Sequence, residues 1–75
     1  MKRKQLFTAI IEREGDMFVA LAPELDVASQ GATVEEARNN LIEAIELFFE
    51  VAGPSEIEGR LHDELFVTQV SIAIE

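Results

Sequence analysis

The chain has 75 residues, a mass of 8.3 kDa and no cysteine, so it has room for one domain with a small core and no disulfide. A single histidine excludes a histidine-rich metal site, and a hydrophobic share of 48% is typical of a folded globular protein. Small domains without disulfides or metals often gain stability by oligomerisation. We therefore expect one domain over residues 1–75 that self-associates.

The net charge of −9 is unevenly distributed along the chain. Three of the six basic residues stand at positions 2–4, in a start (residues 1–5) that we expect to fray, and the rest holds three basic and fifteen acidic residues, a charge of −12. An acidic surface repels nucleic-acid phosphates and attracts basic partners, so direct DNA binding is not expected. Acidity that only keeps a small protein soluble is the alternative.

No segment resembles a signal peptide or a membrane span. The basic start leads into residues 6–11, which include the polar Thr8 and run directly into Glu12 and Arg13. No apolar run approaches the ~18 residues that a membrane helix needs. We expect a cytoplasmic protein without membrane contact, a location that the lack of cysteine fits.

Three strands are predicted in the first third of the chain. Leu6–Arg13 is predicted as a strand, because its residues alternate with a period of two although both faces are fairly apolar; a turn at Glu14–Asp16 and a second strand at Met17–Ala22 follow. Pro23 cannot donate a ladder hydrogen bond and ends that strand. Val27–Gln30 is long enough for a short third strand.

A capping box starts the single predicted helix. The Thr33 hydroxyl should accept from the Glu36 amide, while the Glu36 side chain reaches back to the Thr33 N–H. The helix should run from Val34 to about Val51, with Gly53 in a left-handed conformation after it and Pro54 preventing its continuation.

Residues 55–64 are polar and acidic and predict a loop or one irregular turn, and Leu65–Ile74 alternate again as a final strand. The expected fold class is α+β: order β-β-β-α-β, a four-stranded mixed sheet with one helix on one face, and the last strand parallel to the first. The other sheet face would expose Leu6 and Ile10. Since one helix cannot cover both faces, we expect a second subunit there, in a dimer or a dimer of dimers.

Catalytic chemistry is not indicated. Ser29, Ser55 and Ser71 would all have to share His62, which is best interpreted as a solvated surface histidine. Acids of the helix, such as Glu43 and Glu46, are typical of its wet face, and no glycine-rich phosphate loop is present. We expect no enzyme activity, no cofactor and no metal site.

The stretch from Leu6 to Glu50 resembles the HicB-like antitoxins, a similarity that covers roughly two thirds of the chain. The final strand matches only in type. The pieces that carry the resemblance, in order, are Ile11-Glu12-Arg13, Gly15-Asp16-Met17-Phe18-Val19-Ala20, Pro23-Glu24-Leu25, Ser29-Gln30-Gly31-Ala32-Thr33, Glu35-Glu36-Ala37 and Ile42-Glu43-Ala44-Ile45-Glu46.

The resemblance implies a degenerate ribonuclease H-like fold that lacks the catalytic acids, forms oligomers and neutralises HicA, a small basic RNA-cleaving toxin. Many family members have glycine and cysteine where this chain has Asp26-Val27-Ala28, and many add a C-terminal DNA-binding domain, which we do not expect here. Candidate partner contacts, chosen on charge and expected exposure, are Glu24, Asp26, Glu43, Glu46 and Glu50.

Two other functions remain open. The chain could be an orphan scaffold or small-ligand-binding domain, with a cleft between subunits and no toxin partner. A residual metal-dependent nuclease, using Glu43 and Glu46, is the third reading. A toxin gene beside the gene for this chain would favour the first function over both.

Overall fold

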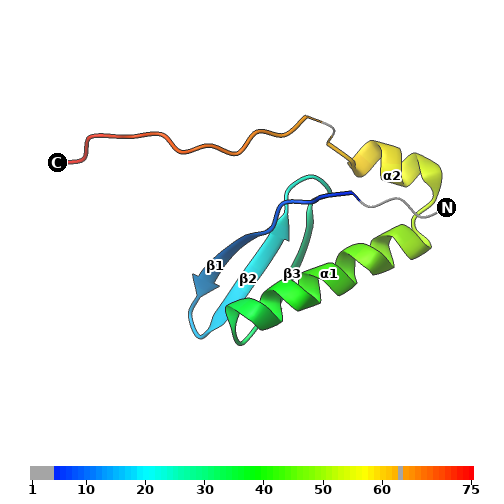
Figure 1. The fold of residues 1–75 in the computed structure, drawn as a ribbon, viewed down its shortest axis with the longest axis horizontal. Helices are drawn as coiled ribbons and strands as arrows, with labels where there is room; N and C mark the ends of the chain where they lie inside the picture. Colours follow the sequence, from blue (N-terminus) through cyan, green and yellow to red (C-terminus); the bar gives the residue numbers. More distant parts are fainter. Residues whose placement is uncertain (1–4, 63) are drawn as a thin grey trace.

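The computed structural model describes residues 5–62 and 64–75. These residues form an α+β domain, as predicted, with a three-stranded sheet, a long helix, a short second helix and an extended C-terminal segment (Figure 1). Of the expected frayed start at residues 1–5, positions 1–4 lie outside the described residues, and Gln5 is exposed. Within the described ranges, no helix combines the length and the apolar character needed to cross a bilayer.

The sheet is antiparallel with the order β1 (Ile10–Glu14), β2 (Met17–Ala22), β3 (Val27–Gly31). Its two hairpins agree with the sequence pattern, and Gly15 adopts the positive φ of 63° that the first turn requires. The first strand begins at Ile10 rather than at Leu6. Residues 5–9 precede it without ladder pairing, because no neighbouring strand extends that far.

The long helix α1 spans Val34–Val51, which confirms the predicted bounds. The Thr33 hydroxyl accepts from the Glu36 amide at 3.0 Å, as expected of a capping box. The reciprocal bond differs from the prediction. The Glu36 Oε1 accepts from the amide of Ala32 at 2.9 Å, one residue before Thr33.

The prediction for the end of α1 was wrong. Gly53 has φ −75° and is not left-handed, and it caps a second helix, α2 (Pro54–Arg60), where a loop or one irregular turn was expected. Pro54 stands in the first turn of α2 and starts that helix as well as ending α1. A proline lacks the N–H that a first turn leaves unused, and its fixed φ suits this position.

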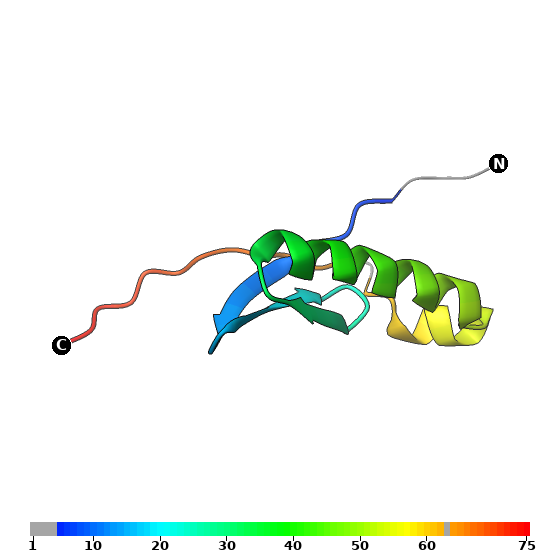
Figure 2. The ribbon, with the colours of Figure 1, turned by 90° about the horizontal axis from the view of Figure 1, so that it is seen from below.

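The predicted fourth strand is also corrected. Residues 64–75, here called the tail, are extended but belong to no sheet, and all twelve are exposed. The tail runs away from the domain (Figures 1 and 2), and the radius of gyration is 14.5 Å against about 11 Å for a compact chain of this length. The sheet therefore has three strands and no parallel pair. A period of two predicts the extended conformation that the tail has, but pairing also needs an adjacent strand.

The core is small and lies between the sheet and α1. Helix α1 covers β3 and β2 and reaches β1 only at its margin (Figure 2). A Cβ on Gly31 would lie 2.5 Å from the Ala37 amide nitrogen, so glycine here allows the start of α1 to approach β3 closely. The buried hydrophobic residues are Ala20, Ala22, Leu25, Ala37 and Leu41.

The opposite face of the sheet is open and largely apolar. The strand register places Ile10, Leu21 and Ala28 in one row across it, and Met17 lies on the same face. Ile10 and Leu21 are 42% and 37% exposed. The predicted exposure of Ile10 and Leu6 is confirmed, although Leu6 lies before β1 and not in the sheet.

Candidate partner-binding surface

The turn between β2 and β3 is held by residues from the end of α2. Asp26 has a positive φ of 55°, a left-handed conformation that aspartate tolerates better than most residues. The Arg60 guanidinium donates to the carbonyl oxygens of Leu25 and Asp26, both at 3.1 Å, and the His62 amide donates to the Glu24 carbonyl at 2.8 Å. Two otherwise unpaired turn carbonyls thus gain a charged donor.

Glu24 in this turn is not the exposed acid that was expected. It is half-buried, and its Oε2 accepts from the Thr8 hydroxyl at 2.6 Å and from the Thr8 amide at 2.8 Å. Burial raises the pKa of the Glu24 carboxyl, but the hydrogen bonds from the Thr8 hydroxyl, the Glu24 amide and the Thr8 amide outweigh it and leave the pKa below its ordinary value. Glu24 is therefore occupied within the fold.

Asp26 is accessible, as predicted. Its carboxylate lies 3.3 Å from the His62 Nε2, and the two side chains are 69% and 51% exposed. Pairs this exposed contribute little to stability, so Asp26 remains available to a partner. The interpretation of His62 as a surface residue agrees with its position.

The other three candidates form one acidic row on α1. Glu43, Glu46 and Glu50 are all exposed, and at 100° per residue they fall within an arc of about 60°. The buried Ala37 and Leu41 point towards the sheet, so this row faces away from it. Among the described residues none of the three acids forms an ion pair.

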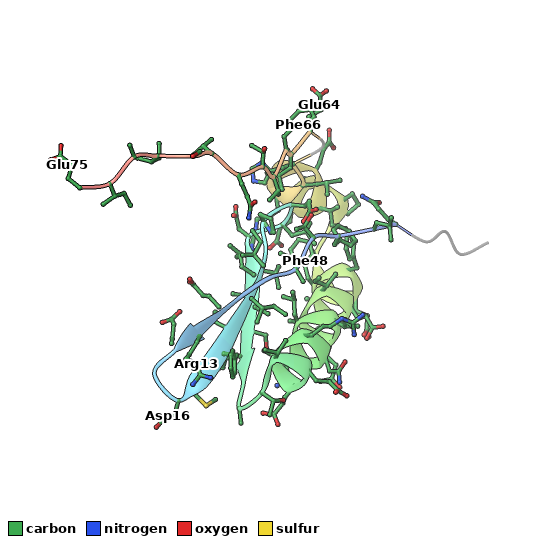
Figure 3. The ribbon with its side chains drawn as sticks, turned by 60° about the vertical axis from the view of Figure 1, so that its left-hand side comes forward. Arg13, Asp16, Phe48, Glu64, Phe66 and Glu75 are labelled. Atoms are coloured by element: carbon green, nitrogen blue, oxygen red, sulfur yellow. The ribbon has the colours of Figure 1, made fainter. Side chains whose placement is uncertain are left out.

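The turn and the C-terminal half of α1 are linked through Arg60. Its guanidinium carbon lies 5.3 Å from the centre of the Phe48 ring, on the C-terminal half of α1 (Figure 3). Such a contact stabilises by about 0.5–1 kcal/mol at an exposed site. Arg60 therefore contacts both the turn that carries Asp26 and the C-terminal half of α1. The Glu24 side chain is used within the fold, in its bonds to Thr8.

A groove lies between the flank of α1 and the segment that precedes β1. It has a volume of about 360 Å³ and separates residues 5–9 from the helix. Phe7 crosses towards α1, with its ring 5.8 Å from that of Phe49. The groove is mainly apolar, and its helical wall is made of Arg38, Leu41, Ile42 and Ile45.

The acidic side chains that the structure describes are not arranged as a metal-dependent nuclease would need. Across residues 5–62 and 64–75, no three side chains of histidine, aspartate or glutamate are placed to hold a metal ion. The row on α1 lies on one convex helix face, whereas metal-assisted hydrolysis uses carboxylates that converge in a shielded cleft. The surface is suited to electrostatic contact with a basic partner.

Comparisons of the chain with protein-family models, curated proteins and solved structures gave no match. The resemblance to the HicB-like antitoxins therefore remains an expectation from the sequence.

Two contacts that organise the turn between β2 and β3 were not predicted from the sequence: that of Arg60, in α2, with the turn carbonyls, and that of Thr8 with Glu24. Helix α2 had a readable signal, with Pro54 at its start, Glu56 in its first turn and Arg60 in its last, where the helix dipole favours each charge. The bond between Thr8 and Glu24 joins residues sixteen positions apart and had no local signal.

Proposed function

We propose that this chain is a non-catalytic HicB-like antitoxin module that binds and neutralises a small basic RNA-cleaving toxin similar to HicA. The observation that carries the proposal is the exposed row of Glu43, Glu46 and Glu50 on α1, and Asp26 is a further exposed acid in the turn between β2 and β3. The order β-β-β-α through residue 51 is the order that the resemblance implies. The ribonuclease H-like relationship of this fold belongs to the proposal.

Charge supports this choice of partner. Outside the first four residues the chain holds fifteen acids and three basic residues, and Arg38 is the one basic residue of α1. A surface of one sign accelerates encounter with an opposite surface, and the gain falls as salt rises. A toxin that binds RNA must itself carry a basic surface, so an acidic module can compete for that surface.

Self-association in the cytoplasm, as a dimer or a dimer of dimers, is part of the same proposal. It is supported by the open apolar sheet face with Ile10 and Leu21 and by the five-residue core, which is small for an independent domain. Light scattering on the purified chain measures the mass directly.

The test starts from a low-salt purification of this chain from its own cells. The proposal expects a small basic protein in stoichiometric amount that is released by high salt. That protein alone should cleave RNA, and adding this chain should stop the cleavage. Recovery of no such protein, or of one whose RNA cleavage continues at saturating amounts of this chain, would contradict the proposal.

A pair of charge-reversal variants tests the surface itself. The double variant Glu46→Lys with Glu50→Lys should weaken binding to the toxin by at least tenfold. The matched control, Glu14→Lys with Asp16→Lys, makes the same change in net charge at the exposed end of β1 and in the turn that follows it. Asp16 lies far along the sheet from α2 (Figure 3). Equal losses in both would show that net charge, and not the row on α1, determines binding.

One feature favours a second function, a small-ligand-binding scaffold without a toxin. The groove between residues 5–9 and α1 has a volume within the range of ligand sites and carries Arg38 among apolar neighbours. A thermal-shift screen with small carboxylates and phosphates tests it. Stabilisation by a ligand, lost in Arg38→Gln, would favour this function over the antitoxin.

A further inference from the structure

We propose that the tail, residues 64–75, is an exchange strand that pairs with the free edge of β1 in a second copy of this chain, while the second copy's tail pairs with the first. The inference rests on the self-association in the proposed function but does not depend on a toxin. It specifies which segment joins the copies and which edge receives it.

The tail has the conformation and the pattern of a strand but no partner. It is extended over twelve residues and lies away from the sheet, with Phe66 and Glu75 along its length (Figure 3). One of its sides carries four large apolar residues that are 71–89% exposed. Exposed apolar surface on this scale marks an interaction site. These residues are Phe66, Val70, Ile72 and Ile74.

The β1 edge offers the matching acceptor. Strand β1 pairs only with β2, so the backbone groups on its other side have no ladder partner among the described residues. Such an edge can receive an added strand by main-chain hydrogen bonds. Strand β1 offers five residues of backbone along this edge, Ile10–Glu14, so part of the tail pairs there and the rest extends beyond it.

The side of α1 above this edge provides the apolar complement. Helix α1 lies over β2 and β3, and its flank towards residues 5–9 carries Ile42 and Ile45 in the wall of the groove, with Phe49 beside Phe7. A strand beside β1 would lie under this flank. One of its two faces would then fill the groove, and the apolar side of the tail has the required spacing of two residues.

The β3 edge is a poorer acceptor. The Asn40 side chain donates to the Gln30 carbonyl at 2.8 Å, which occupies one acceptor of β3 with a group from α1. The apolar body of α1 already covers β3, so no open flank remains above it. The outer edge of the sheet at β1 is therefore the favoured receiver.

The course of the chain favours a second copy over closure onto the same sheet. The tail leaves the domain just after the His62 amide bonds to the Glu24 carbonyl, and from there it runs outward (Figure 1). Its reach is about 40 Å at ~3.3 Å per residue. Reciprocal exchange of one segment gives a closed two-fold dimer, a low-cost route to association that covers both tails and both edges.

A paramagnetic mixing experiment on the full chain tests the exchange. The chain has no cysteine, so Ser71→Cys, on the tail side opposite Ile72, accepts a single spin label. Labelled chain without ¹⁵N is mixed with ¹⁵N chain without label. We expect the amide signals of Ile10–Glu14 in the ¹⁵N chain to broaden most, and the signals of Val27–Gly31, which lie about 15 Å away from the added strand across the sheet, to broaden less.

Each other result would overturn the exchange. Broadening only when label and ¹⁵N share one chain would mean closure onto the same sheet. Stronger broadening at Val27–Gly31 than at Ile10–Glu14 would mean the other edge, and none at all would mean a free tail. Light scattering separates the two proposals. A dimeric mass without broadening at β1 would leave self-association standing and remove the exchange, whereas a mass of 8.3 kDa would remove both.

Two tail variants test the same contact without a label. Ile72→Glu places a charge on the apolar side and should convert the dimer to a monomer at concentrations where the parent chain is dimeric. Ser71→Glu adds the same charge on the other side and should preserve the dimer. A dimer that survives Ile72→Glu, or dissociates equally in both variants, contradicts the proposed face. Circular dichroism of each variant shows that the domain is folded.

Discussion

The carboxylate of Glu24 receives both the hydroxyl and the amide of Thr8, at 2.6 and 2.8 Å. These two bonds attach the segment before β1 to the turn between β2 and β3. The carbonyl of the same glutamate accepts from the His62 amide, where the chain leaves α2. One residue therefore joins three segments that are distant in sequence, and this position fixes where the tail leaves the domain.

Removing the Thr8 hydroxyl should destabilise the domain. Thr8→Val keeps the shape of the side chain and deletes one charge-assisted hydrogen bond, so we expect a loss of about 1–2 kcal/mol in the free energy of unfolding, measured with urea. Thr8→Ser retains the hydroxyl and should recover most of the loss. Equal losses in both variants would show that the methyl group, not the hydrogen bond, is what the site needs.

The same contact predicts a dependence on pH. Because hydrogen bonds lower the pKa of Glu24 in the fold, its contribution is complete above the unfolded pKa of about 4.3 and is lost as the pH falls through the lower folded pKa. The parent chain should exceed Glu24→Gln in stability by a constant amount from pH 7 to about 5. That difference should shrink as the pH falls below about 4. A difference that grows on acidification would contradict the sign.

The features that could be predicted from the sequence are those set by residues close to one another along the chain. The capping threonine, the apolar stripe of α1 and the turn at Gly15 are local signals, and the two hairpins and the helix follow from them. Helix α2 was missed because Pro54 was interpreted only as a stop, although it also suits a first turn. The pairing of the tail depends on a partner that no local pattern identifies.

The candidate partner-binding acids also divide into those that a local pattern placed correctly and one, Glu24, that it did not. The helical period placed Glu43, Glu46 and Glu50 on one exposed face. Charge and turn propensity alone did not show that Glu24 is occupied by Thr8, because burial of a turn residue depends on a segment sixteen positions away.

Gly31→Ala adds only one methyl group but should destabilise the domain strongly. The added Cβ would lie 2.5 Å from the Ala37 nitrogen and 2.8 Å from the Glu36 carbonyl carbon, and both belong to backbone that must shift. We expect a loss of about 1–3 kcal/mol, measured by thermal unfolding. Gly59→Ala is the control, since its Cβ meets nothing within 4 Å and α2 should gain up to about 1 kcal/mol. Equal effects would show that α1 does not need its close approach to β3.

Thr33→Ala tests the start of α1. The variant removes the side-chain acceptor of the Glu36 amide and should cost about 1 kcal/mol. Thr33→Ser keeps the acceptor and should cost little. An unchanged melting temperature in Thr33→Ala would mean that the cap does not contribute and that Glu36 alone, through the Ala32 amide, closes the first turn.

Arg60→Gln should loosen the turn between β2 and β3 without unfolding the sheet. The guanidinium bonds two turn carbonyls and lies over Phe48, and glutamine is too short to keep all three contacts. Hydrogen exchange should accelerate at the amides of Leu25 and His62, which bond to Ala22 and Glu24, while the amides shared by β1 and β2 stay protected. Arg38→Gln makes the same chemical change on the groove flank of α1 and should leave those two amides unchanged. If Arg60→Gln also leaves them unchanged, α2 does not hold the turn, and the accessible Asp26 is positioned by the turn backbone alone.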